Sequence, residues 1–207
     1  GELDGARMHS AGYGFGAPQG APPVEFGMDK VYRPSSPTQI PAEMDSLAKV
    51  HPLVVKIWVD DFNGKYKIKM SPTIYNAIIQ EAHKRGFKVA AHVYYLADLQ
   101  QLVKDGVDIV GHSVRDNLID DATLKMMKEK NIVYIPTLSL DEFAYIYGKK
   151  PEWINDEFFK ASLEPGVYEK ITSAEYQNQL KNSPLYSVNT KAFQTALANV
   201  KRVFDAG

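Results

Sequence analysis

The sequence contains no cysteine among its 207 residues, which excludes disulfide bonds, thiolate metal ligands and cysteine nucleophiles. It also lacks any apolar run of about 18 residues, the length that a membrane-spanning helix requires. Basic and acidic side chains nearly balance, with a net charge of −1, and no long basic run occurs. We therefore expect neither a nucleic-acid partner nor a membrane partner. No signal peptide is visible, so localisation stays open between cytoplasm and periplasm.

The apolar fraction of 44% is ordinary for a globular protein and is sufficient for a buried core. We expect residues 1–207 to form a single domain. The first forty residues are the least regular part, because glycine and proline interrupt both helical and strand periodicity. They indicate a long loop with one short strand near Ala6–Ser10.

The stretch from Phe87 to Asn117 has the pattern of a β-α-β unit with parallel strands. Two short apolar segments, FKVAAH and VDIVGH, end on His92 and His112, and a helical segment with a glycine stop lies between them. The carboxyl ends of neighbouring parallel strands meet at one edge of the sheet, where catalytic groups gather. We therefore expect the two imidazoles to converge on one ion.

Strand and helix patterns alternate through residues 53–140 without a hairpin turn signal. The strand LVVKIWVDD comes first, and Ser71 is expected to cap the helix that follows it. Beyond the β-α-β unit, Asp120 or Asp121 is expected to cap another helix, and NIVYIPTLSL, residues 131–140, to form the last strand. This alternation predicts an α/β fold with a parallel sheet or barrel.

Residues 141–182 differ from the rest by their high aromatic content and by prolines that divide them into short helical pieces. Two interpretations stay open for this segment. It is either an insertion that forms a lid or substrate-facing cap over one end of the sheet, or a packing excursion of the helix that follows the last predicted strand. A final helix is expected over Val188–Phe204, where apolar residues recur at helical spacing.

Lys56 stands in the middle of the apolar strand that begins at Leu53. An isolated buried ammonium group is costly, so this lysine must pair, reach solvent or be chemically altered. Alternation places Lys56 with Val54 and Trp58 on one face of the strand. A structural ion pair and a functional role both explain the lysine at this stage.

Lys56, His92 and His112 occur on successive strands and on the face that lines the interior and mouth of a barrel. Two histidines on adjacent parallel strands are suitable zinc ligands through neutral imidazole nitrogen. A protonated amine repels a metal ion, whereas a lysine carbamate formed with carbon dioxide is anionic and bridges two ions. Each histidine alone is compatible with a satisfied core position, but the three residues together indicate a centre with one or two zinc or other divalent ions.

The segments VVKIWVDD, EAHKRGFKVAAHVYY, DGVDIVGHSVRD and NIVYIPTL resemble the metal-dependent amidohydrolase superfamily, in its imidazolonepropionase-like and Xaa-Pro dipeptidase-like branch. The opening GARMHSAG is similar to a looser form of that branch's glycine-proline-arginine segment. The likeness covers about residues 1–140 and the closing helix, and it is weak through the aromatic segment. It implies a partial (β/α)8 TIM-type barrel, about strands 3 to 7 with their helices.

The resemblance also implies roles for individual residues. Lys56 matches the carboxylated bridging lysine, and His92 and His112 match the histidines of the next two strands. His112 is then both a metal ligand and a catalytic residue that orients the metal or the substrate carbonyl. Tyr94 and Arg7 fall where such enzymes hold a substrate carboxylate or carbonyl, and His9 lies beside Arg7 at the start of the long loop.

The chain departs from the family pattern in two places. It has no His-x-His pair, which the family carries on strand one, and no match for the strand-eight aspartate that acts as general base. These departures indicate an interior fragment that is inactive by itself. Because an open barrel exposes unpaired strand edges, we expect the chain to form homo-oligomers.

The resemblance implies hydrolysis of an amide or peptide-like C–N bond by metal-activated water. The expected substrate is a small amide, a dipeptide or an N-acyl amino acid. Deamination of a cyclic substrate is a weaker alternative, because His92 is followed by Val93-Tyr94-Tyr95 rather than by alanine, glycine and glutamate. A catalytically incomplete fragment or a non-catalytic binding module is the alternative of a different class.

Overall fold

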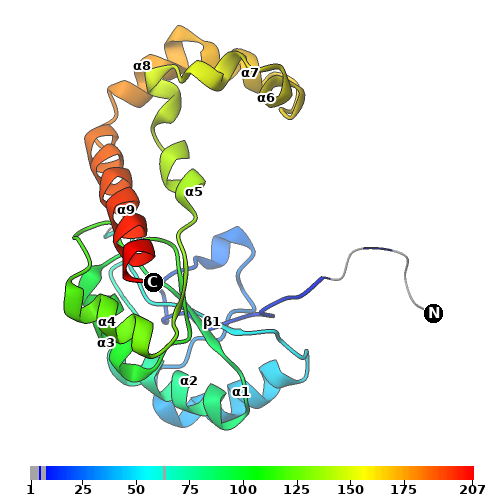
Figure 1. Ribbon diagram of the computed structural model, residues 1–207. Helices are drawn as coiled ribbons and strands as arrows, with labels where there is room; N and C mark the ends of the chain where they lie inside the picture. Colours follow the sequence, from blue (N-terminus) through cyan, green and yellow to red (C-terminus); the bar gives the residue numbers. More distant parts are fainter. Residues whose placement is uncertain (1–4, 6–7, 63) are drawn as a thin grey trace.

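A four-stranded parallel sheet forms the centre of the molecule (Figure 1). The strands are β1 (Val55–Trp58), β2 (Val89–His92), β3 (Ile109–Gly111) and β4 (Val133–Ile135). They lie side by side in the order β1-β2-β3-β4. The structure, a computed structural model, describes residue 5 and residues 8–62 and 64–207. The predicted alternation of parallel strands with helices is confirmed, and the sheet is compatible with a partial barrel.

Helices connect the strands and continue beyond the last of them. The α-helices are α1 (Ile40–Ala48), α2 (Pro72–Lys84), α3 (Leu96–Asp105), α4 (Asp121–Glu129), α5 (Leu138–Phe143), α6 (Glu157–Ala161), α7 (Val167–Thr172), α8 (Ala174–Lys181) and α9 (Tyr186–Ala206). The 3-10 helices are η1 (Val24–Phe26), η2 (Pro37–Gln39), η3 (Ile146–Lys149) and η4 (Glu152–Asn155). Within the described residues, no helix combines the length and the apolar character that a bilayer crossing requires.

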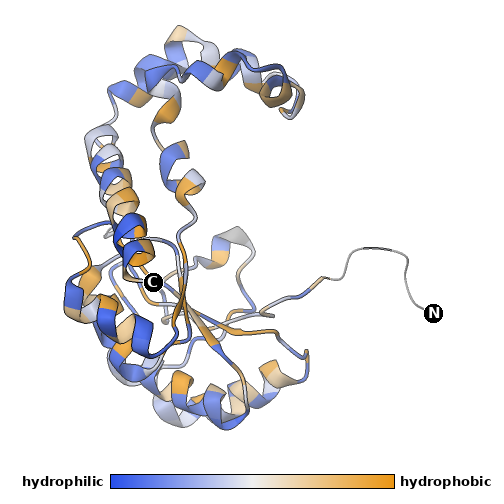
Figure 2. Cartoon of the chain, in the orientation of Figure 1, coloured by the Kyte–Doolittle hydropathy of each residue, from blue (hydrophilic) through white to orange (hydrophobic). Residues whose placement is uncertain are grey.

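The sheet has one covered face and one open face. Val55, Ile57, Ala91 and Val110 are fully buried on the covered face, where they join a core with apolar residues of α2, α3 and α4. Figure 2 shows the hydrophobic residues of these helices turned toward the strands. The opposite face carries Lys56 and its neighbours, which are only partly buried. The predicted alternation along the first strand is therefore confirmed, and Lys56 lies on the open face.

Strand β4 forms an edge of the sheet. Its side chains Val133 and Ile135 are 50% and 47% exposed. Apolar side chains on an unpaired edge favour pairing with another chain. Self-association stays a prediction, because it concerns a second molecule.

The strand expected over residues 131–140 is shorter than predicted. Only Val133–Ile135 is a strand, and α5 already begins at Leu138. Pro136 has no backbone N–H for a sheet bond. Thr137 has a φ of 48°, in the left-handed region, which turns the chain out of the sheet. The prediction failed here because apolar character alone does not separate a strand end from the first turn of a helix.

The short strand expected near Ala6–Ser10 is not supported by the part of it that the structure describes. Ala6 lies outside the described residues, and the chain from residue 8 to residue 10 is irregular and exposed. Phe15 takes the place beside β1 instead. Its N–H donates to the carbonyl oxygen of Lys56 at 2.7 Å, and its own carbonyl accepts from Trp58 N–H at 2.9 Å. A single bridged residue leaves no alternating pattern that a sequence could reveal.

The two predicted helix caps have different outcomes. Ser71 has the extended backbone of an N-cap, but its side chain makes no capping hydrogen bond. Asp120 is the N-cap of α4, and its carboxylate accepts from Thr123 Oγ1 at 2.7 Å, from Thr123 N–H at 2.9 Å and from Gln100 Nε2 at 2.8 Å. These bonds hold the pKa of Asp120 at about 2 and join α4 to α3.

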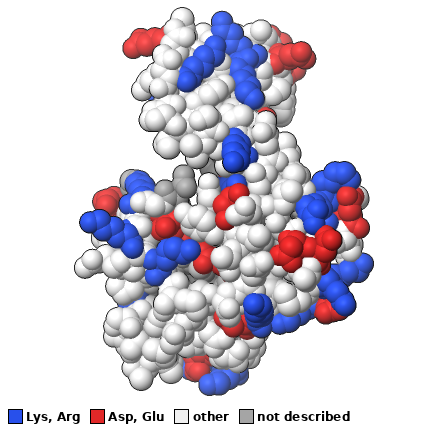
Figure 3. Space-filling model, turned by 90° about the vertical axis from the view of Figure 1, so that its left-hand side faces the viewer, with Lys and Arg blue, Asp and Glu red and all other residues white. Residues whose placement is uncertain are grey.

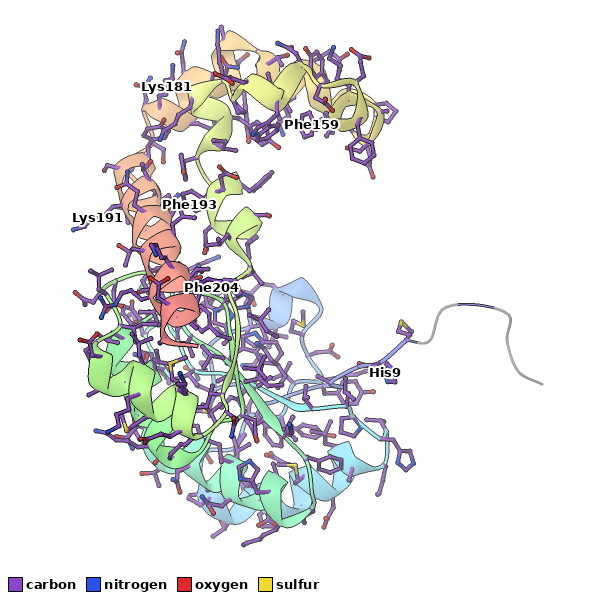
Figure 4. The ribbon with its side chains drawn as sticks, viewed as in Figure 1. His9, Phe159, Lys181, Lys191, Phe193 and Phe204 are labelled. Atoms are coloured by element: carbon purple, nitrogen blue, oxygen red, sulfur yellow. The ribbon has the colours of Figure 1, made fainter. Side chains whose placement is uncertain are left out.

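Residues 141–182 form the short helical pieces that their prolines predicted. Helices α5 and α9 pack against each other and lead away from the sheet, and α6, α7 and α8 form an arch at their far end (Figure 1). Tyr145 and Phe193 contact each other between these two supports, with ring centroids 5.6 Å apart (Figure 4). We call residues 141–182 the cap. Its role as a lid stays a prediction.

Charge of both signs is spread over the sheet-containing part of the molecule. Figure 3 shows lysine, arginine, aspartate and glutamate side chains interspersed there, with a narrower waist between this part and the cap. Arg85, for example, lies between Asp45 and Glu81. Surface pairs of this kind contribute little to stability, commonly below about 1 kcal/mol each.

Candidate functional site

Three of the predicted site residues come together on the open face of the sheet, near the carboxyl ends of β2 and β3. Lys56 comes from β1, His92 is the last residue of β2, and His112 follows β3 directly. The two imidazole rings lie 4.4 Å apart between centroids and meet at 66°. The convergence predicted for these two rings is therefore present in the structure.

His112 reaches this position through an unusual backbone conformation. In the sheet, His92 is aligned with Gly111, so regular alternation would direct His112 to the opposite face. A φ of 74° at His112 changes that direction. Its Nδ1 lies 2.7 Å from Thr137 Oγ1, which fixes the ring. Such an outlier at a strand end is a frequent feature of functional sites.

Burial and nearby positive charge keep the His112 ring neutral. Desolvation is the largest cause, followed by His92 and Lys56, and together they lower the pKa of His112 to about 3. A neutral imidazole has a free lone pair, which metal binding requires. With Nδ1 held by Thr137, Nε2 is the nitrogen left for a ligand role.

His92 is held between an aromatic ring and a carboxylate. Its ring is stacked on Phe62, with centroids 4.9 Å apart and planes 11° from parallel. Its Nε2 lies 3.2 Å from Oδ2 of Asp60, whose side chain is almost fully buried. Asp60 follows β1 and belongs to the same alternating set as Lys56. The site therefore contains a carboxylate in addition to the predicted residues.

Lys56 lies on the open face next to the two histidines. Its Nζ is 5.6 Å from the ring centroid of Trp58, and it would be 3.4 Å from a Cβ placed on Gly111. The glycine therefore leaves the space that the amine occupies. Desolvation lowers the pKa of Lys56 to about 8, although the charge of Asp60 acts in the opposite direction. A substantial fraction of the amine is then neutral near physiological pH.

The lowered pKa makes stability depend on pH. The folded protein loses the Lys56 proton near pH 8, and the unfolded chain loses it near 10.5. The unfolded chain binds more protons in this window, so the free energy of unfolding rises with pH there. In Lys56→Met this rise disappears. Between pH 7 and pH 10, we expect the free energy of unfolding of wild type to rise by about 2–3 kcal/mol relative to that of Lys56→Met.

Urea denaturation of metal-free, carbonate-free protein at several pH values measures this difference. Lys88→Met is the control, because it makes the same substitution at an exposed lysine one residue before β2. The two variants share the background titration of tyrosines, which cancels in the comparison. Parallel pH curves for Lys56→Met and wild type would show that Lys56 is not desolvated.

Lys56, His92 and His112 are the candidate metal donors of this site. In the described part of the chain, no three histidine, aspartate or glutamate side chains form a group that could hold a metal. His92 and His112 supply two imidazole rings, and a carbamate on Lys56 would supply a third, anionic donor. The buried position of Lys56 beside Gly111 and its available neutral amine fit that modification. The residues are thus compatible with a metal centre that includes the carbamate.

Tyr94 lies at the margin of the three-residue cluster. The Arg115 guanidinium is placed over its ring, 4.9 Å from the centroid. Arg115 also donates to Asp141 Oδ1 at 2.7 Å and to the Ser113 carbonyl at 3.0 Å. These contacts connect the ends of β2 and β3 to α5.

Of the two other predicted substrate contacts, the structure describes only His9, and it does not bring His9 to the site. His9 is exposed and lies on the segment leading to the N-terminus, apart from the sheet (Figure 4). Arg7 lies outside the described residues. Substrate binding by either residue stays a prediction.

Sequence reasoning missed Asp60, Thr137, Arg115 and Asp141. Alternation gave a usable signal for Asp60, since positions 56, 58 and 60 share one face. Thr137 had no such signal, because the strand was predicted to continue through residue 140. Asp141 begins the aromatic segment, for which short helical pieces but no contact with the strand ends were predicted. A sequence pattern cannot assign contacts to a helix that it does not predict.

Several solved structures have a fold similar to that of this chain. A Xaa-Pro dipeptidase with methionine bound in its active site has a TM-score of 0.64 and 19% identity, and the match covers 99% of this chain and 47% of that protein. An ochratoxinase from A. niger has a TM-score of 0.55 and 18% identity, over 86% of this chain and 34% of that protein. An amidohydrolase matches with a TM-score of 0.55 and 20% identity, over 87% of this chain and 37% of that protein. These likenesses establish the fold.

No protein-family profile matches the chain. Uncharacterized proteins of Mycobacterium tuberculosis and Mycobacterium bovis are 32% identical to it over 110 residues. The matched part is 51% of this chain and 29% of each of those proteins. The chain thus spans less than a third of the curated relatives that it matches, and less than half of the Xaa-Pro dipeptidase.

Proposed function

We propose that this chain belongs to the metal-dependent amidohydrolase superfamily and takes part in hydrolysis of amide or peptide-like C–N bonds. The observation that carries the proposal is the convergence of Lys56, from the open face of β1, with His92 and His112 at the carboxyl ends of β2 and β3. The fold shared with a Xaa-Pro dipeptidase and an amidohydrolase supports it. In barrels of parallel strands, catalytic groups gather at this end.

In the proposed centre, Lys56 acts as a carbamate. Its neutral amine attacks carbon dioxide, forms an N–C bond and releases one proton. The product is an anion beside two imidazole rings, a donor set suited to zinc or another divalent ion. His92 and His112 bind through ring nitrogen, and Thr137 fixes the orientation of the His112 ring.

A zinc ion in such a site lowers the pKa of a bound water toward about 7 and polarises a carbonyl. The residues of this chain have other tasks. His112 is the catalytic residue through the ion that its Nε2 would hold beside the scissile carbonyl, because its Nδ1 is bonded to Thr137, and Asp60 holds His92 from the side. The phenol of Tyr94 lies at the margin of the cluster, where it can donate to a substrate carbonyl or carboxylate.

The proposed substrate is a dipeptide, another small amide or an N-acyl amino acid. Names of the similar structures support this class, since they include a Xaa-Pro dipeptidase and an amidohydrolase. The partly buried aromatic surroundings of the site suit a small organic molecule.

The competing proposal is a chain that binds without catalysing. One observation favours this alternative. Of the three proposed donors, Lys56, His92 and His112, the lysine can serve only after it has been carboxylated. A catalytic zinc site usually has three protein ligands and a water.

Metal content and turnover separate the two proposals. The chain is incubated with zinc and bicarbonate, desalted, and analysed by plasma mass spectrometry, and its activity on a panel of Xaa-Pro dipeptides and N-acetyl amino acids is then measured. Stoichiometric zinc that disappears in Lys56→Ala supports the metal centre. Zinc below a tenth of an equivalent at every bicarbonate concentration would favour the non-catalytic alternative.

A further inference from the structure

A small cavity lies next to the proposed centre, between the strand ends and the supports of the cap. Its volume is about 150 Å³. The lining residues come from β-strand ends, α5 and α9: Tyr94, Arg115, Leu140, Asp141, Ala144, Asn189 and Ala192. The space is sufficient for one amino-acid side chain and too small for a larger molecule.

Asp141 is the unusual member of this lining. Its side chain is only 5% exposed, and Oδ1 accepts from Arg115. Its second oxygen, Oδ2, is buried and has no hydrogen-bond partner among the described residues. Buried carboxylate oxygens are almost always paired, since an unpaired one is costly. An unpaired oxygen at a cavity wall indicates a missing hydrogen-bond donor.

The surroundings of Asp141 determine which donor suits it. Arg115 already neutralises the carboxylate, so a second cation would bring an uncompensated charge into a buried site. A carboxylate would face Asp141 with like charge. A neutral group with an N–H or O–H satisfies Oδ2 without either penalty. The Asp141 carboxyl rotates readily about its last torsion, which allows Oδ2 to meet such a group.

Arg115 favours a carboxamide among the neutral groups. A guanidinium has five N–H groups, and the bonds to Asp141 and Ser113 employ Nε and Nη1 only. A carboxamide therefore donates to Asp141 and accepts from Arg115 at the same time. The Tyr94 ring, on which Arg115 is stacked, closes one side of the cavity.

The cavity is connected to the proposed centre through short segments. Tyr94 is two residues beyond His92, and its carbonyl accepts from Arg115 N–H at 2.9 Å. We propose that the cavity is the pocket for a substrate side chain. This inference rests on the hydrolysis proposed above for the neighbouring site. The cavity selects a neutral hydrogen-bond donor, with a carboxamide preferred over cationic, anionic and purely apolar side chains.

Binding without turnover tests the pocket. The probes are the N-acetyl methylamides of glutamine, methionine and lysine, which differ only in the side chain and have no ionised ends. Each is titrated into ¹⁵N-labelled, metal-free chain and followed by amide shifts. We expect the glutamine compound to bind about tenfold more tightly than the other two. The largest shifts should fall on Arg115, Asp141 and Asn189.

Blocking variants provide the control. Ala192→Leu fills the cavity from α9, and Ala144→Leu fills it from the exposed rim after α5. Either should weaken binding of the glutamine compound about tenfold or more. Ala198→Leu places the same side chain on an exposed position of α9 and should leave binding unchanged. Thermal denaturation confirms that each variant is folded.

The proposal is overturned if the three compounds bind within twofold of one another, if none binds, or if both folded blocking variants bind the glutamine compound as wild type does. The hydrolytic proposal fails separately. Absence of zinc and of turnover would remove the reaction, yet the binding preference measured in metal-free protein would still be observed.

Discussion

Replacement of Asn199 by alanine should lower the free energy of unfolding by about 3–5 kcal/mol. Asn199 is fully buried in α9 and bonds three backbone groups of the loop after β3. Its Oδ1 accepts from Ile119 N–H at 2.9 Å, and its Nδ2 donates to the carbonyls of Val114 and Asn117, both at 2.9 Å. Alanine leaves the Ile119 N–H and the Val114 carbonyl buried without this partner, and burial without a partner costs more than the lost bonds themselves.

Urea denaturation followed by circular dichroism measures the loss. Gln194→Ala is the matched control, because it shortens an exposed polar side chain of the same helix and should change stability by less than about 0.5 kcal/mol. Asn199→Asp retains an acceptor for Ile119 and loses both donations, so a substantial loss is also expected. A loss below 1 kcal/mol for Asn199→Ala would mean that water reaches the loop.

Zinc affinity should fall about 100-fold or more in His112→Asn. Asparagine is the residue that separates ligation from folding here. It tolerates the left-handed backbone of His112, with its φ of 74°, and its amide can still bond Thr137. The imidazole nitrogen, in contrast, is lost. Competition with a zinc-binding dye, in the presence of bicarbonate, measures the dissociation constant.

His51→Asn is the matched control for this experiment. His51 is exposed, has a φ of 49° and precedes the amino-terminal end of β1, at the end of the sheet opposite the proposed centre. The same substitution at a similar backbone conformation should leave zinc affinity unchanged. Equal affinities for His112→Asn and wild type would show that zinc is bound elsewhere on the chain.

The regular part of the fold could be predicted from the sequence. Apolar runs separated by helical spacing and glycine stops locate β1, β2 and β3 to within a few residues, and Asp120 identifies the start of α4. Parallel alternation also placed His92 and His112 at one edge of the sheet. These features follow from periodicity, which depends on neighbours along the chain.

The remaining parts depend on contacts between distant segments. Thr137 turns the chain after β4 and holds the His112 ring, yet nothing in the letters around Pro136 distinguishes this turn from a longer strand. Phe15 pairs with β1 through one residue, without a periodic pattern. The Arg115–Asp141 pair joins the segment after β3 to α5, a helix whose first residues, 138–140, were predicted as strand. Backbone conformation at single residues decided each of these cases.

The apolar residues of the cap form a cluster of their own, around Tyr147, Ile154 and Ile171, separate from the large core under the sheet. A cluster of this size stabilises its segment less than the main core stabilises the strands. The amide hydrogens of α6, α7 and α8 should therefore exchange with solvent water through local opening, while those of β1 to β3 exchange only when the whole chain unfolds. Loosening of the cap is then thermodynamically independent of the strand ends, and the strand ends keep their geometry while the cap opens locally.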